Sequence, residues 1–552
     1  MASRRENPRR LTTPRLQIKL ALSSRPSTAE TVVSVKSTDS ENTVVHKDVL
    51  RLYREASLPS ILGGKKSFDD SNTVPSGATF GEIPLSDRSR YSDIVSWTGD
   101  SDPDNPMNWS GGKKALNLGV IILTCFASPF ASSVFAPALS DMMTEFKETD
   151  QYLAGFVISI YVLGYAIGPL VVAPLSEQFG RAICYHVCIL IFFTFTMACA
   201  FAKNLRSLAV LRFLSGCGGS VVFALAPSSV TDMVRPPRRG AFVALIGMGY
   251  NLGPAISPMV GSHINAAFGW RWVFRTTGFL GILCFVLSVL FLSETYEPVL
   301  LERRARRMRK STGNQNLRSK FASVLPPGKH FVNVMLRPLK LLLFSPNIFL
   351  VSFITAVGYG YMYMLYTTFP SVFVLTYHWK PQNIGLAYLG TAVGNLLAMV
   401  IGGVVGDLWV KERAIRGDMK PENRLLPMII AWPLVPVGLL VYGWTRRENT
   451  HWMWPLVGTA IFGMGSMSAI LFSSTYIVEA YETHSASATA ASSVLRSLVG
   501  GLVPLFAFKL YNKKDFGLAN SLLAGIALVL CPVPFVFYRY GERLRKRFKM
   551  DL

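Results

Sequence analysis

Two arginines, Arg212 and Arg496, stand inside long uncharged stretches of the sequence. A guanidinium in such a place is costly and normally functional, because it needs acceptors, cavity water or a ligand. Counted from the expected helix ends, Arg212 lies about five residues deep and Arg496 about eleven, so at about 1.5 Å per residue only Arg496 nears the bilayer midplane. We expect both to face a central cavity. Arg212 could instead extend to the membrane surface, which Arg496 cannot reach.

A row of tyrosines offers a matching binding wall. Tyr359, Tyr363 and Tyr366 share one helix face at i, i+4 and i+7. Aromatic surfaces adapt to varied apolar ligands, and phenol hydroxyls can bond a polar substituent. The same residues could instead pack or form an interfacial belt. Side chains of other stretches complete the candidate binding set: Asn251 and Tyr161 first, then Tyr250, Tyr165 and Asn395.

Carboxylates are missing from the depth of the apolar stretches. The acidic residues nearest to them stand at stretch ends: Asp232, Glu294 and Glu479. The pattern therefore identifies no proton carrier. A polycation in a medium of low dielectric constant needs carboxylate partners, so a polyamine substrate is disfavoured. A neutral or weakly acidic lipophilic compound suits two buried arginines better.

Other chemistries find no matching pattern. All seven cysteines fall inside apolar stretches, and Cys184 and Cys188 share a helix face without accompanying metal ligands. The sequence has no Gly-x-x-x-x-Gly-Lys-Ser/Thr phosphate loop and no visible pairing of a nucleophile with a base. We therefore expect no metal, no cofactor, no disulfide framework and no enzymatic activity.

Membrane-spanning helices must position these residues. Of the 552 residues, 50% are hydrophobic and only 16% are charged. Apolar runs near the length of about 20 residues that crosses a bilayer recur after residue 114. In lipid the helix is the only open-chain structure that satisfies the backbone, so the fold class is an all-α membrane protein. The twelve predicted spans are 114–137, 152–173, 182–202, 207–230, 240–264, 272–292, 346–373, 383–406, 425–444, 452–477, 485–508 and 517–538.

The loops predict the orientation. Basic residues cluster on one side of the spans: Arg181, Arg235, Arg238, Arg239, the 293–345 connection, the 411–424 loop and the C-terminal tail. That side should be cytosolic, and an even number of spans places both termini there. The net charge of +23 is concentrated in these loops and tails, so nucleic-acid binding is excluded.

Composition divides the chain into five parts. We expect a disordered cytosolic tail at 1–112, a six-helix bundle at 113–292, a basic cytosolic connection at 293–345, a second six-helix bundle at 346–538 and a basic tail at 539–552. The first 25 residues hold many arginines and resemble a transit peptide in composition. The alternative is a solvated basic arm that touches anionic lipid, because no apolar signal core follows.

Short motifs repeat between the two bundles. Spans 2 and 8 each end in a segment that contains glycine and then an acidic residue. The acidic residue is Glu177 after span 2 and Asp407 after span 8. The two carboxylates lie about 230 residues apart, as do the first spans of the bundles, which is typical of parallel duplication in transporters.

These motifs resemble those of fungal major facilitator superfamily transporters, in the twelve-span drug:proton antiporter family, whose branch includes multidrug, polyamine and secondary-metabolite exporters. The resemblance covers residues 103–549. The matching segments are 105–109, 168–170, 174–181, 212–216, 253–254, 270–272, 294–296, 298–301 and 481–488.

The resemblance implies roles for particular residues. Arg212 matches the family arginine implicated in proton transfer. The conformational motif is implied at Gly168, Glu177, Gly180, Arg181 and Asp407. The antiporter motif of span 5, thought to seal the interface between the halves, is implied at Gly249, Gly253, Pro254 and Gly261.

The sequence departs from the family pattern at some of these positions. Glu177 stands where Asp is common and Ala182 where a second Arg is common, so the first motif could be a plain turn. Ser257 and Ser262 replace common glycines, so span 5 could simply pack closely.

Together these features predict a secondary active transporter that exports a small lipophilic, neutral or weakly acidic compound by proton antiport and alternating access. Proton-coupled uptake of a small metabolite and a non-transporting membrane sensor remain alternatives. The expected partners are the small-molecule substrate, the proton and the lipid bilayer. A monomer spanning the cell membrane many times is expected.

Overall fold

The computed structural model describes residues 17–18, 34–36, 42–44, 93–99, 101–321, 327–416, 420–447, 450–481, 485–513 and 515–547. The chain forms two compact units, Met1–Pro84 and Leu85–Leu552. In the first unit, β2 (Ser34–Lys36) pairs antiparallel with both β1 (Gln17–Ile18) and β3 (Asn42–Val44). The sequence shows no strand period there. The strands are only two or three residues long, too short for such a period, and carry β-branched residues that favour pairing.

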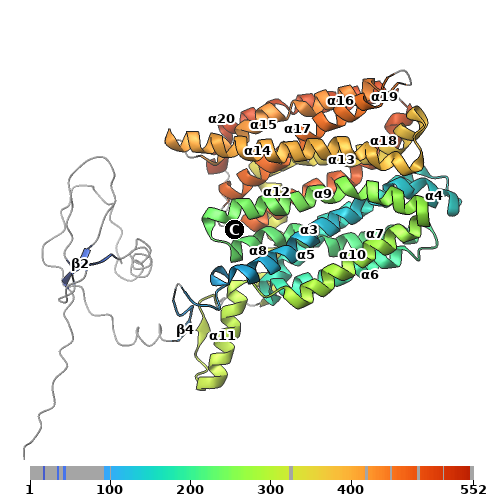
Figure 1. The fold of residues 1–552 in the computed structure, drawn as a ribbon. Coiled ribbons are helices and arrows are strands. Elements are labelled where there is room, and N and C mark those ends of the chain that lie inside the picture. Colours follow the sequence, from blue (N-terminus) through green and yellow to red (C-terminus); the bar gives the residue numbers. More distant parts are fainter. Residues whose placement is uncertain are drawn as a thin grey trace, which may run out of the picture. The chain divides into compact units, whose positions relative to one another are not determined.

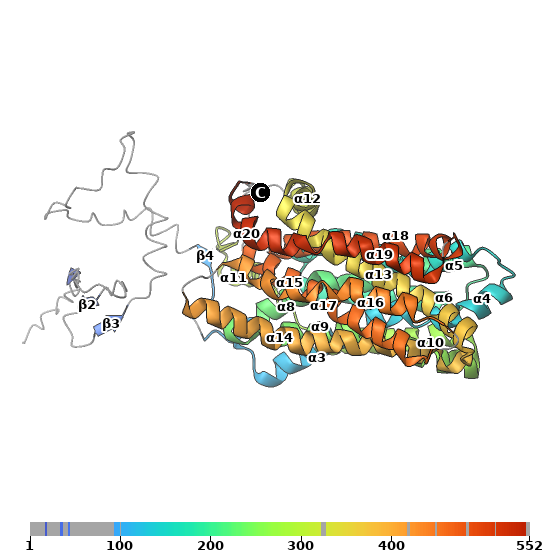
Figure 2. The same ribbon diagram turned by 90° about the horizontal axis from the view of Figure 1, so that it is seen from above.

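The second unit is a bundle of long helices running side by side, as Figures 1 and 2 show from two directions. Within the described residues, eleven helical segments are long and apolar enough to cross a membrane. The first group comprises α3 (Gly111–Ser133), α5 (Gln151–Phe179), α6 (Arg181–Cys199), α7 (Leu205–Gly219), α8 (Val221–Met233), α9 (Pro236–Phe268) and α10 (Trp270–Phe291). The second comprises α13 (Pro346–Tyr377), α14 (Leu389–Ile415), α15 (Leu426–Ala431), α16 (Leu434–Trp444), α17 (Met453–Ala480), α18 (Ser485–Lys513), α19 (Phe516–Val529) and α20 (Pro532–Arg547).

The helices fill the positions of all twelve predicted spans, with two local differences. α9 has 33 residues at the position of span 5, but it is not among the eleven apolar segments. Three predicted spans consist of two consecutive helices: α7–α8, α15–α16 and α19–α20. In two of these spans a proline, Pro433 or Pro532, stands where the second helix begins. The helix is interrupted there because proline cannot donate the backbone hydrogen bond that a continuous helix needs.

The two groups of helices form two layers (Figure 1). α5 packs against α18 and α9 against α14, so these four helices join the layers. Short helices complete the end of the bundle opposite the start of α3: η2 (Ala136–Ala138), α4 (Leu139–Glu145) and η3 (Pro381–Tyr388). The start of α3 and the end of α20 lie at the same end of the bundle (Figure 1), as an even number of crossings requires.

The connection between the bundles and the part of the chain just before α3 both contain secondary structure. The 293–345 connection contains α11 (Glu297–Thr312), β5 (Arg318–Ser319) and α12 (Pro327–Phe344). Within the expected disordered tail at 1–112, β4 (Ile94–Val95) pairs parallel with β5, and η1 (Pro106–Asn108) precedes α3. Val95, Ala305 and Leu317 form a small buried cluster beneath this pairing. So small a core, drawn from distant segments, leaves no periodic signal in the sequence.

The orientation can be tested directly. We expect epitope tags at residues 1 and 552 to be protected from external protease in intact cells, because the basic loops predict a cytosolic location for both ends. A tag inserted at Thr149, in the exposed loop before α5, should be digested and serves as the control. Digestion of either terminal tag would contradict the orientation.

Candidate substrate cavity and gating network

Arg212 is held at the end of α3. Its side chain is buried, with Nη1 donating to the carbonyl of Ala131 at 2.7 Å and Nη2 to that of Ser132 at 2.8 Å. Both carbonyls belong to the last turn of α3, where they have no partner within the helix. The guanidinium also lies over the rings of Phe135 and Tyr161, 4.3 and 4.4 Å from their centroids. Arg212 therefore stays in the interior instead of extending to a membrane surface.

The predicted tyrosine row is continuous on α13 and reaches the other layer. The Tyr359 and Tyr363 hydroxyls are 3.5 Å apart, and the rings of Tyr363 and Tyr366 lie 5.8 Å apart. Tyr363 donates across the layers to Ser132 Oγ at 3.1 Å, and the carbonyl of the same Ser132 accepts from Arg212. Tyr366 packs against Tyr388 within its own layer. Tyr359 and Tyr363 therefore face the centre, whereas Tyr366 belongs to the packing of the second layer.

Arg496 lies between the two layers with few polar partners. Its guanidinium is 5.3 Å from the ring centroid of Tyr359 on α13 and 5.7 Å from that of Phe223 on α8. Nη2 donates to Ser493 Oγ at 3.5 Å, and the buried Nε has no hydrogen-bond partner among the described residues. No ion pair of Arg496 with a carboxylate is found in the described part of the chain. This guanidinium retains capacity to bind an acceptor.

Phe223 is a neighbour of Arg496 that the sequence analysis did not name. Its ring stacks on Tyr250 at 4.7 Å and meets Tyr165 edge-on at 4.8 Å. The Tyr165 hydroxyl is hydrogen-bonded to Ser128 Oγ at 2.8 Å, which ties this aromatic wall to α3. A phenylalanine in an apolar span carries no distinguishing signal, so only the arrangement of α8 opposite α18 identifies it.

The two asparagines lie apart from the tyrosines. Asn251 donates to Gly247 O at 2.7 Å and approaches Met399 Sδ at 3.5 Å, where α9 meets α14. Asn395 is buried in α14 against Gly463, and its Oδ1 has no partner among the described residues. Within the described residues, no hydrogen bond joins either asparagine to Tyr359, Tyr363 or Tyr366.

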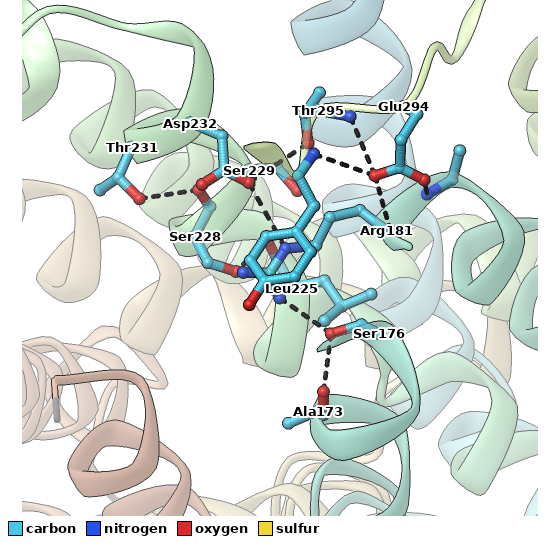
Figure 3. A network of polar contacts seen from close by, with 12 residues as sticks. Ala173, Ser176, Arg181, Leu225, Ser228, Ser229, Thr231, Asp232, Glu294 and Thr295 are labelled. Atoms are coloured by element: carbon cyan, nitrogen blue, oxygen red, sulfur yellow. Dashed lines mark hydrogen bonds and ion pairs between the residues drawn. The ribbon is translucent and has the colours of Figure 1, made fainter. Parts of the chain in front are cut away.

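Glu294 lies in a polar network with Arg181, Asp232 and Thr295 (Figure 3), next to Gly180. Gly180 has φ +102° and ψ 160°, a conformation essentially limited to glycine, and a Cβ there would collide with the Glu294 carboxylate. That carboxylate accepts the N–H groups of Arg181 at 2.9 Å, Ala182 at 3.3 Å and Tyr296 at 2.9 Å. The N–H groups of Arg181 and Ala182 belong to the first turn of α6, and a negative charge is favourable at the N-terminus of a helix.

The Arg181 side chain extends the network to α8 (Figure 3). Its Nε lies 3.4 Å from Asp232 Oδ2, and Nη1 donates to Ser176 Oγ at 2.8 Å. Its guanidinium also lies 4.7 Å from the ring centroid of Tyr296. Arg181 therefore joins the ends of α5, α6, α8 and α10. The sequence placed Asp232 and Glu294 at span ends but did not assign them to this network.

The other residues of the conformational motif are Gly168, Glu177 and Asp407. A Cβ on Gly168 would meet Cys217 O at 2.8 Å, so glycine permits close approach of α5 and α7. Burial first, and then the nearby Glu177 carboxylate, raise the pKa of Tyr296 to about 12. Asp407 belongs to α14, but its side chain lies outside the described part of the structure.

The span 5 motif packs inside the first layer. A Cβ on Gly253 would lie 2.7 Å from Phe126 O of α3, and one on Gly249 would lie 3.3 Å from Ile122 O. A Cβ on Gly261 would likewise meet Val134 O. Three residues after Pro254, the Ser257 hydroxyl is hydrogen-bonded to Ser133 Oγ of α3 at 2.8 Å. The glycine face thus contacts α3. Other α9 residues reach the second layer, since Ser262 Oγ donates to Gln382 O at 3.1 Å.

Known transporters share both sequence and fold with this chain. It is 41% identical over 456 residues to the MFS-type transporter atr4 of Stereocaulon alpinum, covering 83% of each chain. It is 38% identical over 488 residues to the efflux pump radE of Floropilus chiversii, covering 88% of this chain and 90% of that protein.

Solved structures share the fold at low identity. The xylose transporter XylE from E. coli, in a partially occluded inward-open conformation, matches with a TM-score of 0.58 at 15% identity, over 78% of this chain and 98% of XylE. The human organic anion transporter MFSD10 matches with a TM-score of 0.56 at 16% identity, over 77% of this chain and all (100%) of that chain.

A family model adds the decisive match, over residues 121–504. This region holds the buried arginines, the tyrosine row and the Gly180 network. The similar proteins are named transporters, and their fold is the one described above. The chain is therefore a multi-pass membrane transporter and not an enzyme, and it belongs to the Major Facilitator Superfamily.

Proposed function

We propose that the transporter exports a small lipophilic, neutral or weakly acidic compound through the space between its two layers, by proton antiport. The observation that carries the substrate class is Arg496, whose guanidinium lies near two aromatic rings and makes, within the described residues, one long hydrogen bond, to Ser493. One similar protein is named an efflux pump, which supports the outward direction.

The surroundings of Arg496 suit an apolar compound with an acceptor group. A carboxylate or carbonyl would gain a charge-assisted hydrogen bond from the guanidinium, which is about twice as strong as a neutral one. The rings of Tyr359 and Phe223 would cover the apolar part of the compound. A cationic compound would be repelled, because the described contacts of Arg496 include no carboxylate to balance it.

Alternating access would require some contacts between layers to break. Tyr363–Ser132 joins the layers near their centre, and Ser262–Gln382 joins them at the end opposite the start of α3. Both are single hydrogen bonds, each contributing about 0.5–1.5 kcal/mol. We propose that opening toward that end breaks them, while the Gly180 network keeps the ends of α5, α6, α8 and α10 together as one body.

Arg212 fits a supporting role in proton antiport. A guanidinium is not deprotonated in proteins, so Arg212 cannot itself carry the proton. Its bonds to Ala131 and Ser132 fix the end of α3 beside Tyr363. We propose that Arg212 sets the local potential and the position of Ser132, and that the proton is carried elsewhere.

The remaining parts of the assignment are also proposals. Each layer acts as one six-helix half, with the basic 293–345 connection between them and both termini cytosolic. The transporter works as a monomer in the cell membrane. The Glu177 carboxylate and the start of α18 lock the halves in one facing state.

The function is tested by measuring accumulation of a compound panel in cells with and without the chain. We expect lower accumulation of lipophilic weak acids when the chain is present, and no change for polyamines. Collapsing the proton gradient should remove the difference if transport is proton antiport. Higher accumulation would indicate uptake, and equal accumulation of every compound would indicate a protein that does not transport them.

A further inference from the structure

The segment before α3 forms a strap on α11. We define the strap as residues 93–99 and 101–109. Trp97 Nε1 donates to Glu297 Oε1 at 2.8 Å, and Arg304 forms an ion pair with Asp102 at 2.7 Å. The β4–β5 pairing and the buried Val95 add backbone and apolar contacts. One side of α11 is therefore occupied by the strap.

The strap ion pair is stable across physiological pH. The N–H of Thr98 first, and then Arg304, hold the pKa of Asp102 well below its usual range. A carboxyl whose pKa is lowered contributes stability above its ordinary pKa and loses it only in strong acid. Arg304 is thus neutralised locally, and α11 is fixed in orientation.

The opposite side of α11 is a basic face made of Arg303, Arg306, Arg307 and Lys310. These positions are three or four residues apart and point about 200° away from Leu301 on the buried side, at about 100° per residue. All four side chains are exposed, whereas Leu301 and Ala305 are fully buried.

Most charge on this face is free of ion pairs. Arg306 pairs with Glu302 at 3.2 Å, with 71% of the Arg306 side chain exposed. No ion pair is found for Arg303, Arg307 or Lys310 within the described residues. The face therefore presents a net positive charge to its surroundings.

The direction of α11 matches a membrane surface. In Figure 1, α11 lies across the direction of the long helices, at the end of the bundle where α3 begins. Since the long helices cross the bilayer, a helix that lies across them at their end runs along the bilayer surface. That is the cytosolic surface in the predicted orientation, where anionic lipids concentrate.

We propose that the basic face of α11 binds the headgroups of anionic phospholipids in the adjacent leaflet. The charges are complementary, and the strap holds the helix in place, so little conformational entropy is lost on binding. The site goes beyond the proposed transport function and does not depend on it.

The test places a fluorophore at Ser311→Cys, an exposed position beside the basic face. Six of the seven native cysteines lie in span helices and Cys531 lies between α19 and α20. All seven are buried or half-buried, which limits background labelling. The full chain is reconstituted in nanodiscs, and quenching by headgroup-labelled phosphatidylserine is compared with quenching by labelled phosphatidylcholine. Each basic residue near an anionic surface contributes about a fivefold preference, so the wild type should quench far more with phosphatidylserine.

The variant Arg303→Gln/Arg307→Gln/Lys310→Gln should lower this preference by one to two orders of magnitude if the contributions add. Glutamine keeps the helix propensity, so α11 should remain folded. The matched control Lys203→Gln/Arg206→Gln/Lys380→Gln removes the same charge from exposed positions at the other end of the bundle and should leave the preference unchanged.

Three outcomes would overturn the proposal. One is equal quenching by the two lipids in the wild type, and another is an undiminished preference in the α11 variant. The third is loss of the preference when inorganic phosphate is added at constant ionic strength, which would indicate a site for free phosphate. Raised salt alone should weaken the preference through screening.

Discussion

Arg496→Gln is expected to abolish export of weakly acidic compounds while the protein still folds. The guanidinium has one long hydrogen bond, to Ser493, so its removal disturbs little of the native packing. A hydrogen bond to a charged group contributes about 1.5–3 kcal/mol, so affinity for an acidic compound should fall by about tenfold to 100-fold. The measurement is export by cells expressing equal amounts of each folded protein.

Two variants separate charge from geometry at this position. Arg496→Lys keeps the charge but lacks the planar guanidinium, so we expect poor export. Ser493→Ala removes the hydroxyl to which Arg496 Nη2 donates and should leave export nearly normal. Normal export of acidic compounds by Arg496→Gln would show that the residue is structural, and the case for a weakly acidic substrate would fail with it.

Gly180→Ala is expected to destabilise the protein and to lower transport of every substrate. The backbone conformation of Gly180 costs a residue with a Cβ about 1–3 kcal/mol. In addition, the new Cβ would displace the Glu294 carboxylate, which accepts hydrogen bonds from the N–H groups of Arg181 and Ala182 at the start of α6. Thermal unfolding of the purified protein and transport in cells measure the two effects.

Gly269 provides a matched control for the loss of stability that is due to backbone conformation alone. It has φ 84° and ψ 165°, close to the conformation of Gly180, but a Cβ there meets nothing within 4 Å. Gly269→Ala should therefore lose only the conformational part of the stability. Equal losses in the two variants would indicate that the Glu294 network contributes nothing beyond backbone conformation.

The long helices were predictable because bilayer length imposes a strong and local pattern. Each helix must satisfy its own backbone and present about 20 apolar residues, so its position can be read without knowing its neighbours. The row of Tyr359 and Tyr363 was predictable for the same reason, because helical spacing alone defines a face. Breaks such as the one before Pro433 were less visible, since both helices remain apolar.

Features that depend on two distant segments were not predictable. Val95 and Leu317 lie more than 200 residues apart, and their contact orders a strap where composition indicated a disordered tail. The resemblance implies that the span 5 motif seals the interface between the halves. Gly249 and Gly253 pack against α3 in the same layer, whereas other α9 residues, such as Ser262, meet the second layer. A glycine-rich face indicates close approach without specifying the partner.

By itself, the sequence determined the membrane helices, the scarcity of deep carboxylates and the two arginines that must be satisfied within the bilayer. Tertiary structure decided how each arginine is satisfied. Both guanidiniums lie near aromatic rings, and each has a buried Nε without a hydrogen-bond partner among the described residues. Arg212 donates to two carbonyls at the end of α3, whereas Arg496 makes one long hydrogen bond, to Ser493. The physical reason is that charge and hydropathy are properties of a residue, but its hydrogen-bond partners depend on which helix ends and rings packing brings to it.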